Sequence, residues 1–146
     1  MELYSNINES MKLHITDKSS IYSLQKEFNS EFPFLRIEFF KKMHKPGEGL
    51  SKNVMYTSDK LIGEIRSLRK NGDLDVKDEM RVSELEAIFG DDFGLSVQVF
   101  RKSGNVWLET TRTDNWTLRQ QNDEGESLHN HFGLDKKDDY DYHEQE

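Results

Sequence analysis

The chain has no cysteine and only two prolines among its 146 residues. Without cysteine it can form no disulfide, carry no thiolate nucleophile and hold no cysteine-ligated zinc. No apolar run approaches the roughly 20 residues of a membrane-spanning helix, and residues 1–10 lack the apolar centre of a secretion signal. These absences predict a soluble protein of the cytoplasm.

Hydrophobic residues are also scarce, at 34%, and charged residues make up 33% of the chain. Disordered chains share such a composition, but regular apolar spacing and nine phenylalanines favour a folded domain. The net charge is −8, and residues 135–146 contribute −4 of it through six acids and two lysines. Net charge therefore predicts no polyanion-binding surface, although a local basic face stays open as an alternative.

The clearest positive feature is an internal repeat. Apolar residues alternate with polar ones, then recur at helical spacing, then alternate again, and this strand–helix–strand pattern occurs twice. The first copy contains Leu13, Ile15, Asp17, Ile21, Leu24, Phe28 and Phe32, which recur 61 residues later as Leu74, Val76, Asp78, Val82, Leu85, Phe89 and Phe93. After a one-residue skip the spacing is 60 residues, and the matched sets are Leu35, Ile37, Phe39, Phe40, Lys41 and Lys42, then Leu95, Val97, Val99, Phe100, Arg101 and Lys102.

Two such units in tandem predict an α+β fold, the ferredoxin-like sandwich, in which right-handed crossovers place both helices on one face of a single sheet. The first repeat covers 11–42 and the second covers 73–102. Between them, apolar residues at helical spacing predict an inserted helix over 57–71 that stops at Asn71-Gly72.

A hairpin strand and a helix are expected over 105–122, after a turn at Gly104. Thr117 and Gln120 have the spacing of a capping box at the start of that helix, and Ser83 and Glu86 have it at the start of the second repeat's helix. The whole predicts one domain over 11–122, with a flexible N-terminus at 1–10 and a polar acidic tail at 123–146.

Phe40 and Phe100 are matched exceptions on the otherwise polar face of the sheet, the face that points away from the repeat helices. One interpretation is that the inserted helix and the C-terminal helix cover them. The other is that a partner covers them, because exposed apolar patches on soluble monomers are small and often functional. The sequence leaves both interpretations open.

Basic residues recur at matching strand ends beside these phenylalanines. A cation next to an aromatic ring is typical of surfaces that bind single-stranded nucleic acid. RNA-binding sandwiches, however, carry their stacking aromatics on the two central strands, where this chain has His14 and Asp75. The basic residues are Lys41, Lys42, Arg101 and Lys102.

Trp107 and Trp116 lie close together in the sequence. We expect them to pack against each other under the C-terminal helix, or else to anchor a partner. The hairpin around Trp107 and the continuation Thr113-Asp114-Asn115-Trp116-Thr117-Leu118 resemble a family of small bacterial proteins of unknown function. The resemblance covers residues 80–122 and implies no activity.

No catalytic or metal-binding motif stands out. Paired acids serve catalysis only when burial separates their pKa values, and the pattern places these acids on solvated helix faces and turns. His129, His131 and His143 lie among aspartates in a segment without apolar spacing, so no preorganised metal site is expected. The sequence therefore predicts no catalytic residue, no metal and no cofactor. The acids concerned are Glu84, Glu86, Asp91, Asp92, Glu109 and Asp114.

The leading hypothesis is a non-enzymatic protein-interaction module, which could be a homodimer, with edge-strand pairing or sheet-face packing as the binding mode. The alternative is a single-stranded nucleic-acid-binding domain that uses the basic strand ends and binds with a steep salt dependence. A third hypothesis, an enzyme with a cleft between the sheet and the inserted helix, has no residue in its favour. The candidate interaction surface comprises Phe40, Phe100, Trp107, Trp116, Lys41, Lys42, Arg101 and Lys102.

Overall fold

The computed structural model describes residues 10–41 and 54–132. Lys42, most of the N-terminal segment expected to be flexible, and the acidic tail beyond Phe132 lie outside the described residues. None of the described helices is long and apolar enough to cross a membrane. The elements in chain order are β1 (Ser10–Ile15), α1 (Ile21–Glu31), β2 (Leu35–Phe40), α2 (Ile62–Ile65), β3 (Gly72–Lys77), α3 (Val82–Phe93), β4 (Ser96–Ser103), β5 (Val106–Glu109), a 3₁₀ turn (Thr111–Thr113) and α4 (Leu118–Phe132).

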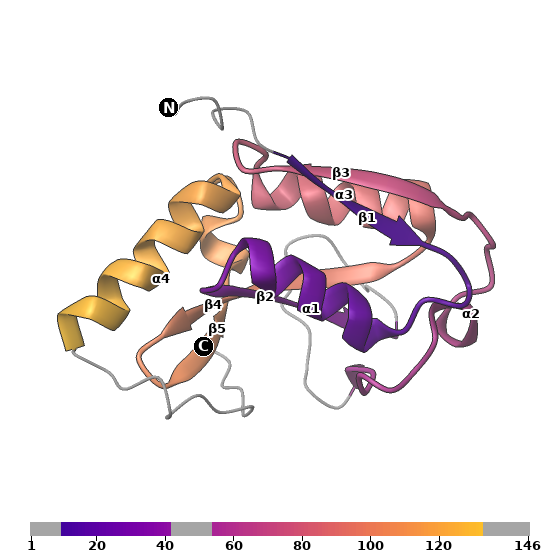
Figure 1. Cartoon of the computed structure of the whole chain (residues 1–146), viewed down its shortest axis with the longest axis horizontal. Helices are drawn as coiled ribbons and strands as arrows, with labels where there is room; N and C mark the ends of the chain where they lie inside the picture. The colour runs from indigo at the N-terminus through magenta and orange to yellow at the C-terminus, as the bar shows by residue number, and fades with distance from the viewer. Residues whose placement is uncertain (1–9, 42–53, 133–146) are drawn as a thin grey trace.

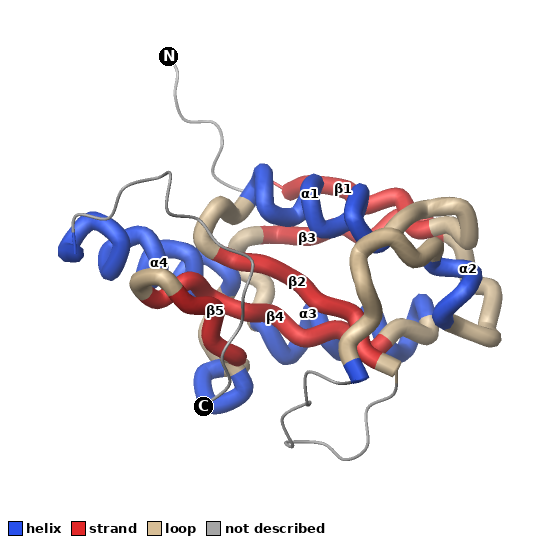
Figure 2. Tube along the Cα trace, turned by 90° about the horizontal axis from the view of Figure 1, so that it is seen from below, coloured by secondary structure: helices blue, strands red, loops and turns tan. Residues whose placement is uncertain are grey.

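The strands form two antiparallel sheets. β1 pairs with β3, and β4 lies between β2 and β5. Figure 1 shows β1 and β3 side by side along the top of the molecule, with the three-stranded sheet beneath them and α4 extending from one end. Figure 2 places α1 and α3 on opposite sides of the β2–β4 pair. The two repeat helices thus flank the space between the sheets.

Both sheets and both repeat helices contribute one face to a common core. Leu13 of β1 and Ile37 of β2 are fully buried in it, together with Phe28 of α1 and Phe89 of α3. The inward residues are those that the alternating and helical spacings identify, because a strand turns every second side chain, and a helix every third or fourth, toward the same neighbour. The α+β class is confirmed.

The strand pairing differs from a single ferredoxin-like sheet, because β2 pairs with β4 in a sheet separate from β1 and β3. The reason lies at the free edge of β2, which side chains of α1 occupy. Gln25 Nε2 donates to Ile37 O at 2.7 Å, and Asn29 Nδ2 donates to Leu35 O at 2.8 Å. Because these carbonyls already accept hydrogen bonds from α1, they are not available to pair with the backbone of β3.

In each sheet the strand register places opposite each other two residues that have the spacing of the sequence repeat. Leu13 lies directly opposite Leu74 in the β1–β3 sheet, and Glu38 lies directly opposite Gln98 in the β2–β4 pair. Leu13 and Leu74 are equivalent in the sequence repeat, and Glu38 and Gln98 have the 60-residue spacing of the matched positions around them. When two residues with the repeat spacing lie directly opposite each other in an antiparallel pair, a rotation of 180° about an axis through that residue pair places one strand on the other.

Helix α2 is much shorter than the helix expected over 57–71. It ends at Ile65, because Arg66 has an extended backbone with φ −142° and ψ 151°. The Arg66 side chain turns inward and is buried, which holds the chain after it in an irregular path. The expected helix is therefore wrong over 57–61 and from Arg66 onward.

The backbone contacts between α2 and the turn before α1 recur between the start of α4 and the turn before α3. The first residue of α2 or α4 donates a backbone hydrogen bond to that turn, and the first residue of α1 or α3 donates one in return. These bonds are Ile62 N to Ser19 O (2.8 Å) and Ile21 N to Lys60 O (2.9 Å), then Leu118 N to Met80 O (2.8 Å) and Val82 N to Trp116 O (3.0 Å).

The start of α3 corrects one of the two expected capping boxes. The N-cap of α3 is Arg81, whose backbone N donates to Glu84 Oε1 at 2.8 Å, so the pairing of Ser83 with Glu86 is wrong. The capping box of α4 is confirmed, since the backbone N of Thr117 donates to Gln120 Oε1 at 2.8 Å and the backbone N of Gln120 donates to Thr117 Oγ1 at 3.1 Å.

Helix α4 continues to Phe132, through the first part of the segment expected to be a tail from 123 onward. Its first residue, Leu118, is fully buried in the apolar core, but the helix beyond it docks through a polar seam. Gln121 is fully buried, accepts a hydrogen bond from Arg101 Nη1 at 2.8 Å and donates one to Thr113 O at 2.8 Å. Sequence analysis locates helices by the spacing of their apolar residues. It therefore does not detect the part of a helix that docks through amide side chains.

Gly125 lets α4 approach the sheet closely, and we expect Gly125→Ala to lower stability. A Cβ at this position would lie 2.7 Å from Phe34 Cβ and 3.3 Å from Lys102 O. We expect a loss of about 1–3 kcal/mol, typical of overpacking, in urea unfolding followed by circular dichroism. Gly90→Ala in α3 is the matched control, because its Cβ would meet only Leu95 O at 3.8 Å. The control should gain about 0.5–1 kcal/mol from helix propensity, and an equal gain at Gly125 would contradict the close contact.

Candidate interaction surface

The outer face of the three-stranded sheet carries a second apolar cluster, made of Phe40, Phe100 and Trp107, with Val54 and Met55 packed against it. The three rings are 2%, 0% and 7% exposed. Of the two interpretations of Phe40 and Phe100, burial within the chain is the one that these values support. The described cover comes from the segment before α2, at Val54 and Met55, rather than from α2 or α4.

Trp107 lies between two cations. The Arg36 guanidinium is 5.4 Å from the centroid of the indole ring, and Lys102 Nζ is 5.9 Å from it. Arg36 is also ion-paired, since its Nε lies 2.9 Å from Glu38 Oε2. A cation–π contact of this kind contributes about 0.5–2 kcal/mol, depending on desolvation. The sequence repeat did not single out Arg36, because the equivalent position in the second repeat is Ser96.

Arg101 and Trp116 form a separate contact beside α4. Successive residues of a strand point to opposite faces, so Arg101 points away from the face that Lys102 shares with Trp107. Arg101 Nη1 donates to Gln121 Oε1, and its guanidinium lies 5.7 Å from the centroid of Trp116. The two tryptophans are thus on different faces, and the aromatic contacts of the described residues do not include the expected packing between them.

The candidate residues therefore divide into two groups. Lys102 joins the buried cluster around Trp107, whereas Arg101 joins α4 and Trp116. Lys41 is exposed at the end of β2, where its backbone N donates to Val54 O at 2.9 Å, and Lys42 lies outside the described residues. The basic strand ends do not gather on one surface of the described structure.

Glu86 and Glu109 are partly buried carboxylates, contrary to the expectation of solvated helix faces and turns. Glu86 Oε2 accepts hydrogen bonds from Val99 N at 2.9 Å and from Gln98 Nε2 at 3.3 Å. Burial, together with the negative charges of Asp114 and Glu109, raises the pKa of Glu86 to about 8. Burial also raises the pKa of Glu109. Because α3 begins earlier than expected, Glu86 is free of any capping role and faces β4 instead.

No group of three or more metal-binding side chains is placed to hold an ion within 10–41 and 54–132. His129 of α4 packs its ring against Phe34, with the centroids 5.5 Å apart. A shallow groove of about 410 Å³ lies along α4 and is lined by Trp116, Gln120, Asp123, Glu124 and Ser127. It does not lie between a sheet and α2, where the third hypothesis places a cleft.

The two sheets differ in how many side chains of the described residues bond to the backbone along their edges. In the three-stranded sheet, Gln25 and Asn29 cover the edge of β2, and Glu86 and Thr110 bond the backbone of Val99 in β4. β1 and β3 pair only with each other over the described part of the chain. The one described side chain that bonds their backbone is Ser19, whose hydroxyl donates to His14 O at 3.2 Å.

The outer face of the β1–β3 sheet is charged: β1 carries Lys12 and His14, and β3 carries Asp73 and Asp75, with Lys77 at its end. Lys12 of β1 pairs with Asp75 of β3, with Nζ 2.7 Å from Oδ1, and His14 contacts Asp73 in the same way. The hydrogen bond between them raises the pKa of Lys12 and lowers the pKa of Asp75. The Lys12 and Asp75 side chains are 59% and 53% exposed, so both remain accessible to a partner.

No protein-family model, no curated protein and no solved structure matches the chain. The chain is an α+β protein with two antiparallel sheets, and over the described residues the strands β1 and β3 pair only with each other.

Proposed function

We propose that the protein is a non-enzymatic interaction module that binds a partner protein by adding a strand to the β1–β3 sheet. The observation that supports this most directly is a contrast among the described residues: side chains bond the edge of β2 and the part of β4 that precedes its pairing with β5, whereas Ser19 is the one described side chain that bonds the backbone of β1 or β3. An uncovered edge offers a row of backbone donors and acceptors to any extended segment. A second copy of the chain is one such partner, and the complex is then a homodimer.

The charges of the two strands indicate which segments fit. A strand added beside β3 lies next to Asp73 and Asp75 and should carry lysine or arginine at alternate positions. A strand added beside β1 lies next to Lys12 and His14 and should carry acids. Opposite charges directly across a strand pair contribute about 0.2–1 kcal/mol each, which sets preference rather than most of the affinity.

Sheet-face packing through Phe40, Phe100 and Trp107 is the second binding mode that we propose. The aromatic rings and the flanking Arg36 are of the residue types that anchor protein interfaces. Because the rings are buried, this mode requires the chain around Val54 and Met55 to move first. Strand addition needs no such movement of the described residues, so we place it first.

We also infer that the chain is a tandem duplication of one unit, as the ferredoxin-like interpretation assumed, but with a longer unit. Two observations support this: equivalent residues oppose each other in both sheets, and the same backbone bonds recur at α2 and at the start of α4. The unit then includes α2 in the first copy and the start of α4 in the second.

Nucleic-acid binding through Lys41, Lys42, Arg101 and Lys102 is the alternative function. It has less support, because Arg101 and Lys102 point to opposite faces and Lys102 is only 7% exposed. A backbone-tracking site needs its cations along one groove.

A comparison of two charge variants in an affinity pulldown tests strand addition. The tagged full-length chain is incubated with native cell lysate, with and without nuclease, and recovered proteins are quantified by mass spectrometry. Asp73→Lys with Asp75→Lys reverses the charge beside the β3 edge, and recovery of the specific partner should fall about tenfold, which corresponds to about 1.4 kcal/mol.

The matched control is Glu27→Lys with Glu31→Lys on exposed positions of α1, which changes the net charge equally. It should recover the partner as the wild type does, and circular dichroism should show both variants folded. Equal recovery with the β3 variant would count against the β3 edge. Recovery that disappears with nuclease would favour the nucleic-acid alternative instead.

A further inference from the structure

The strand pairing divides the chain into two halves that depend on each other. The first half holds β1, α1, β2 and α2, and the second holds β3, α3, β4, β5 and α4. Each half has local structure of its own, such as the β4–β5 hairpin and the bond from α2 to the turn before α1. Both remaining pairings, β1 with β3 and β2 with β4, join one half to the other. Neither half therefore completes a core alone.

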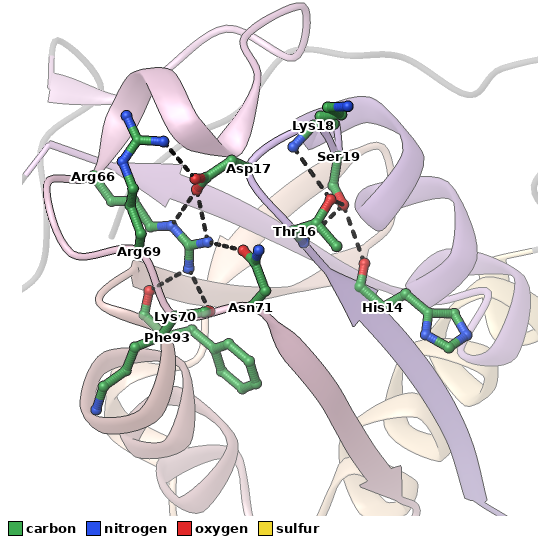
Figure 3. Close-up of polar contacts among 10 residues, drawn as sticks. All are labelled: His14, Thr16, Asp17, Lys18, Ser19, Arg66, Arg69, Lys70, Asn71 and Phe93. Atoms are coloured by element: carbon green, nitrogen blue, oxygen red, sulfur yellow. Dashed lines mark hydrogen bonds and ion pairs between the residues drawn. The ribbon is translucent and has the colours of Figure 1, made fainter.

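A single linker, residues 67–71, connects the halves, and its path is set by Arg66. Figure 3 shows the Arg66 guanidinium between Asp17, the linker backbone and the end of α3. The Arg66 side chain is 0% exposed. Leu68, in contrast, is one of the exposed large apolar side chains, at 48%. The linker thus holds its position mainly through Arg66 rather than through a packed core of its own.

All five donors of the guanidinium are used. Nε and Nη2 donate to Asp17 Oδ1 at 3.2 and 2.9 Å, and Nη2 also donates to Asn71 Oδ1 at 2.9 Å. Nη1 donates to Lys70 O at 2.9 Å and to Phe93 O at 2.8 Å. Asp17 belongs to the first half, Phe93 to the second, and Lys70 and Asn71 to the linker. One side chain thus fixes the linker against both halves.

We propose that two copies of the chain can exchange their second halves, and that Arg66 is the lock that keeps the halves of one copy together. Every contact between the halves is then remade between two chains, so the exchanged dimer needs no new interface in the two sheets. The linker must open to connect the copies, and the contacts of Arg66 with Lys70, Asn71 and Phe93 cannot all persist. Exchange of identical elements is a low-cost route to dimers when a hinge segment opens.

This inference does not rest on strand addition at the edges of β1 and β3. An edge-paired dimer keeps β1 and β3 of the same chain together, whereas an exchanged dimer pairs β1 of one chain with β3 of the other. The two assemblies can be told apart by the chain that supplies the partner of Lys12, which is Asp75.

A double substitution in the full-length chain, Lys12→Cys with Asp75→Cys, shows whether the residue opposite position 12 comes from the same chain or from the other copy. The natural sequence has no cysteine to interfere, and both positions are exposed cross-strand partners. The protein is unfolded in urea with reductant, refolded at low and high concentration, oxidised, and separated on non-reducing gels. Exchange gives a covalent dimer whose share rises with concentration, and a closed monomer gives only an intrachain disulfide.

The lock is tested by adding Arg66→Met to this pair, with Arg69→Met as the matched control. Arg69 makes a single contact, Nη1 to Asp17 Oδ2 at 2.9 Å, and its side chain is 74% exposed. We expect Arg66→Met to raise the dimer-to-monomer ratio about tenfold, and Arg69→Met to leave it near the wild-type value.

A linker without Leu68 and Arg69 provides a second test should Arg66→Met fail to fold. The shortened segment cannot fold back within one chain, so we expect dimers at all concentrations in light scattering, with interchain disulfides. Intrachain disulfides alone, in the Arg66 variant and in the shortened chain at every concentration, would overturn the proposal.

Discussion

Replacing Arg66 by methionine should lower the free energy of unfolding by about 3 kcal/mol or more. Methionine keeps most of the buried aliphatic volume but donates no hydrogen bond. The Lys70 and Phe93 carbonyls, the Asn71 amide oxygen and the Asp17 carboxylate would all lose a partner that Arg66 now supplies. Each unsatisfied buried acceptor costs about 1–3 kcal/mol, and water that enters the site reduces the sum.

Arg69→Met is the control for this effect, as it removes one contact to the same Asp17 from an exposed side chain. Exposed ion pairs typically contribute at most about 1 kcal/mol, so its loss should be small. Arg66→Lys separates charge from geometry, because lysine keeps the charge but cannot reach four groups at once with three donors. Urea unfolding at low protein concentration, which disfavours dimers, measures all three variants.

Equal losses for Arg66→Met and Arg69→Met would show that the Asp17 ion pair, rather than the linker contacts, carries the stability. The pH dependence adds an independent check. The hydrogen bond from Arg66 holds the pKa of Asp17 below its ordinary value, so this pair stabilises the fold above the ordinary pKa of aspartate and is lost as pH falls through the lowered pKa. That acid-side loss should be smaller in Arg66→Met.

The elements that sequence analysis locates well are those with strong periodicity. α1 and α3 bury residues at helical spacing, and β1 and β3 bury every second residue. β2 and β4 keep the alternating core residues but bury residues of their second face as well. α4 is predicted only at its start, where Thr117 and Gln120 cap it. Its continuation docks through Gln121 and Gly125, an amide and a glycine that carry no apolar signal. Hydrophobic spacing therefore does not predict where α4 ends, because its continuation docks through residues that carry no apolar signal.

Sheet topology depends on contacts that the repeat pattern does not contain. The pattern is equally compatible with one sheet or two, and the outcome is decided where Gln25 and Asn29 bond the edge of β2. Neither residue has a special signature, as polar residues at such positions usually face water. In the same way the sequence matched Phe40 with Phe100 and placed Trp107 beside Trp116, and only the structure shows that Phe40, Phe100 and Trp107 are buried together.

Glu86→Gln should stabilise the protein at alkaline pH, and the gain should grow as pH rises. The pKa of Glu86 is about 8, against 4.5 for an ordinary glutamate. The folded state therefore holds this proton more tightly than the unfolded state. The stability linked to Glu86 is fully present below pH 4.5 and is lost progressively until pH passes about 8. At about 1.4 kcal/mol per unit of pKa shift, the whole loss is on the order of 5 kcal/mol.

Glutamine removes the titration and should retain the hydrogen bonds. The equivalent residue of the first repeat is already a glutamine: Gln25 donates to Ile37 O at 2.7 Å and to Glu38 Oε1 at 3.0 Å. At position 86 the amide oxygen can accept from Val99 N as the carboxylate does. The amide nitrogen then needs an acceptor, which the oxygen of Gln98 supplies if its amide group rotates.

Unfolding of the wild type and of Glu86→Gln should be compared at several pH values between 5 and 9. The difference between the two proteins isolates Glu86 from other groups, such as Asp75, whose lowered pKa gives the opposite trend at acid pH. It should be near zero at pH 5 and reach several kcal/mol in favour of glutamine at pH 9. Glu126→Gln, at an exposed position of α4, should give a small and constant difference. Parallel curves for the wild type and Glu86→Gln would mean that water or a cation reaches the Glu86 carboxylate, because a solvated carboxylate keeps its ordinary pKa.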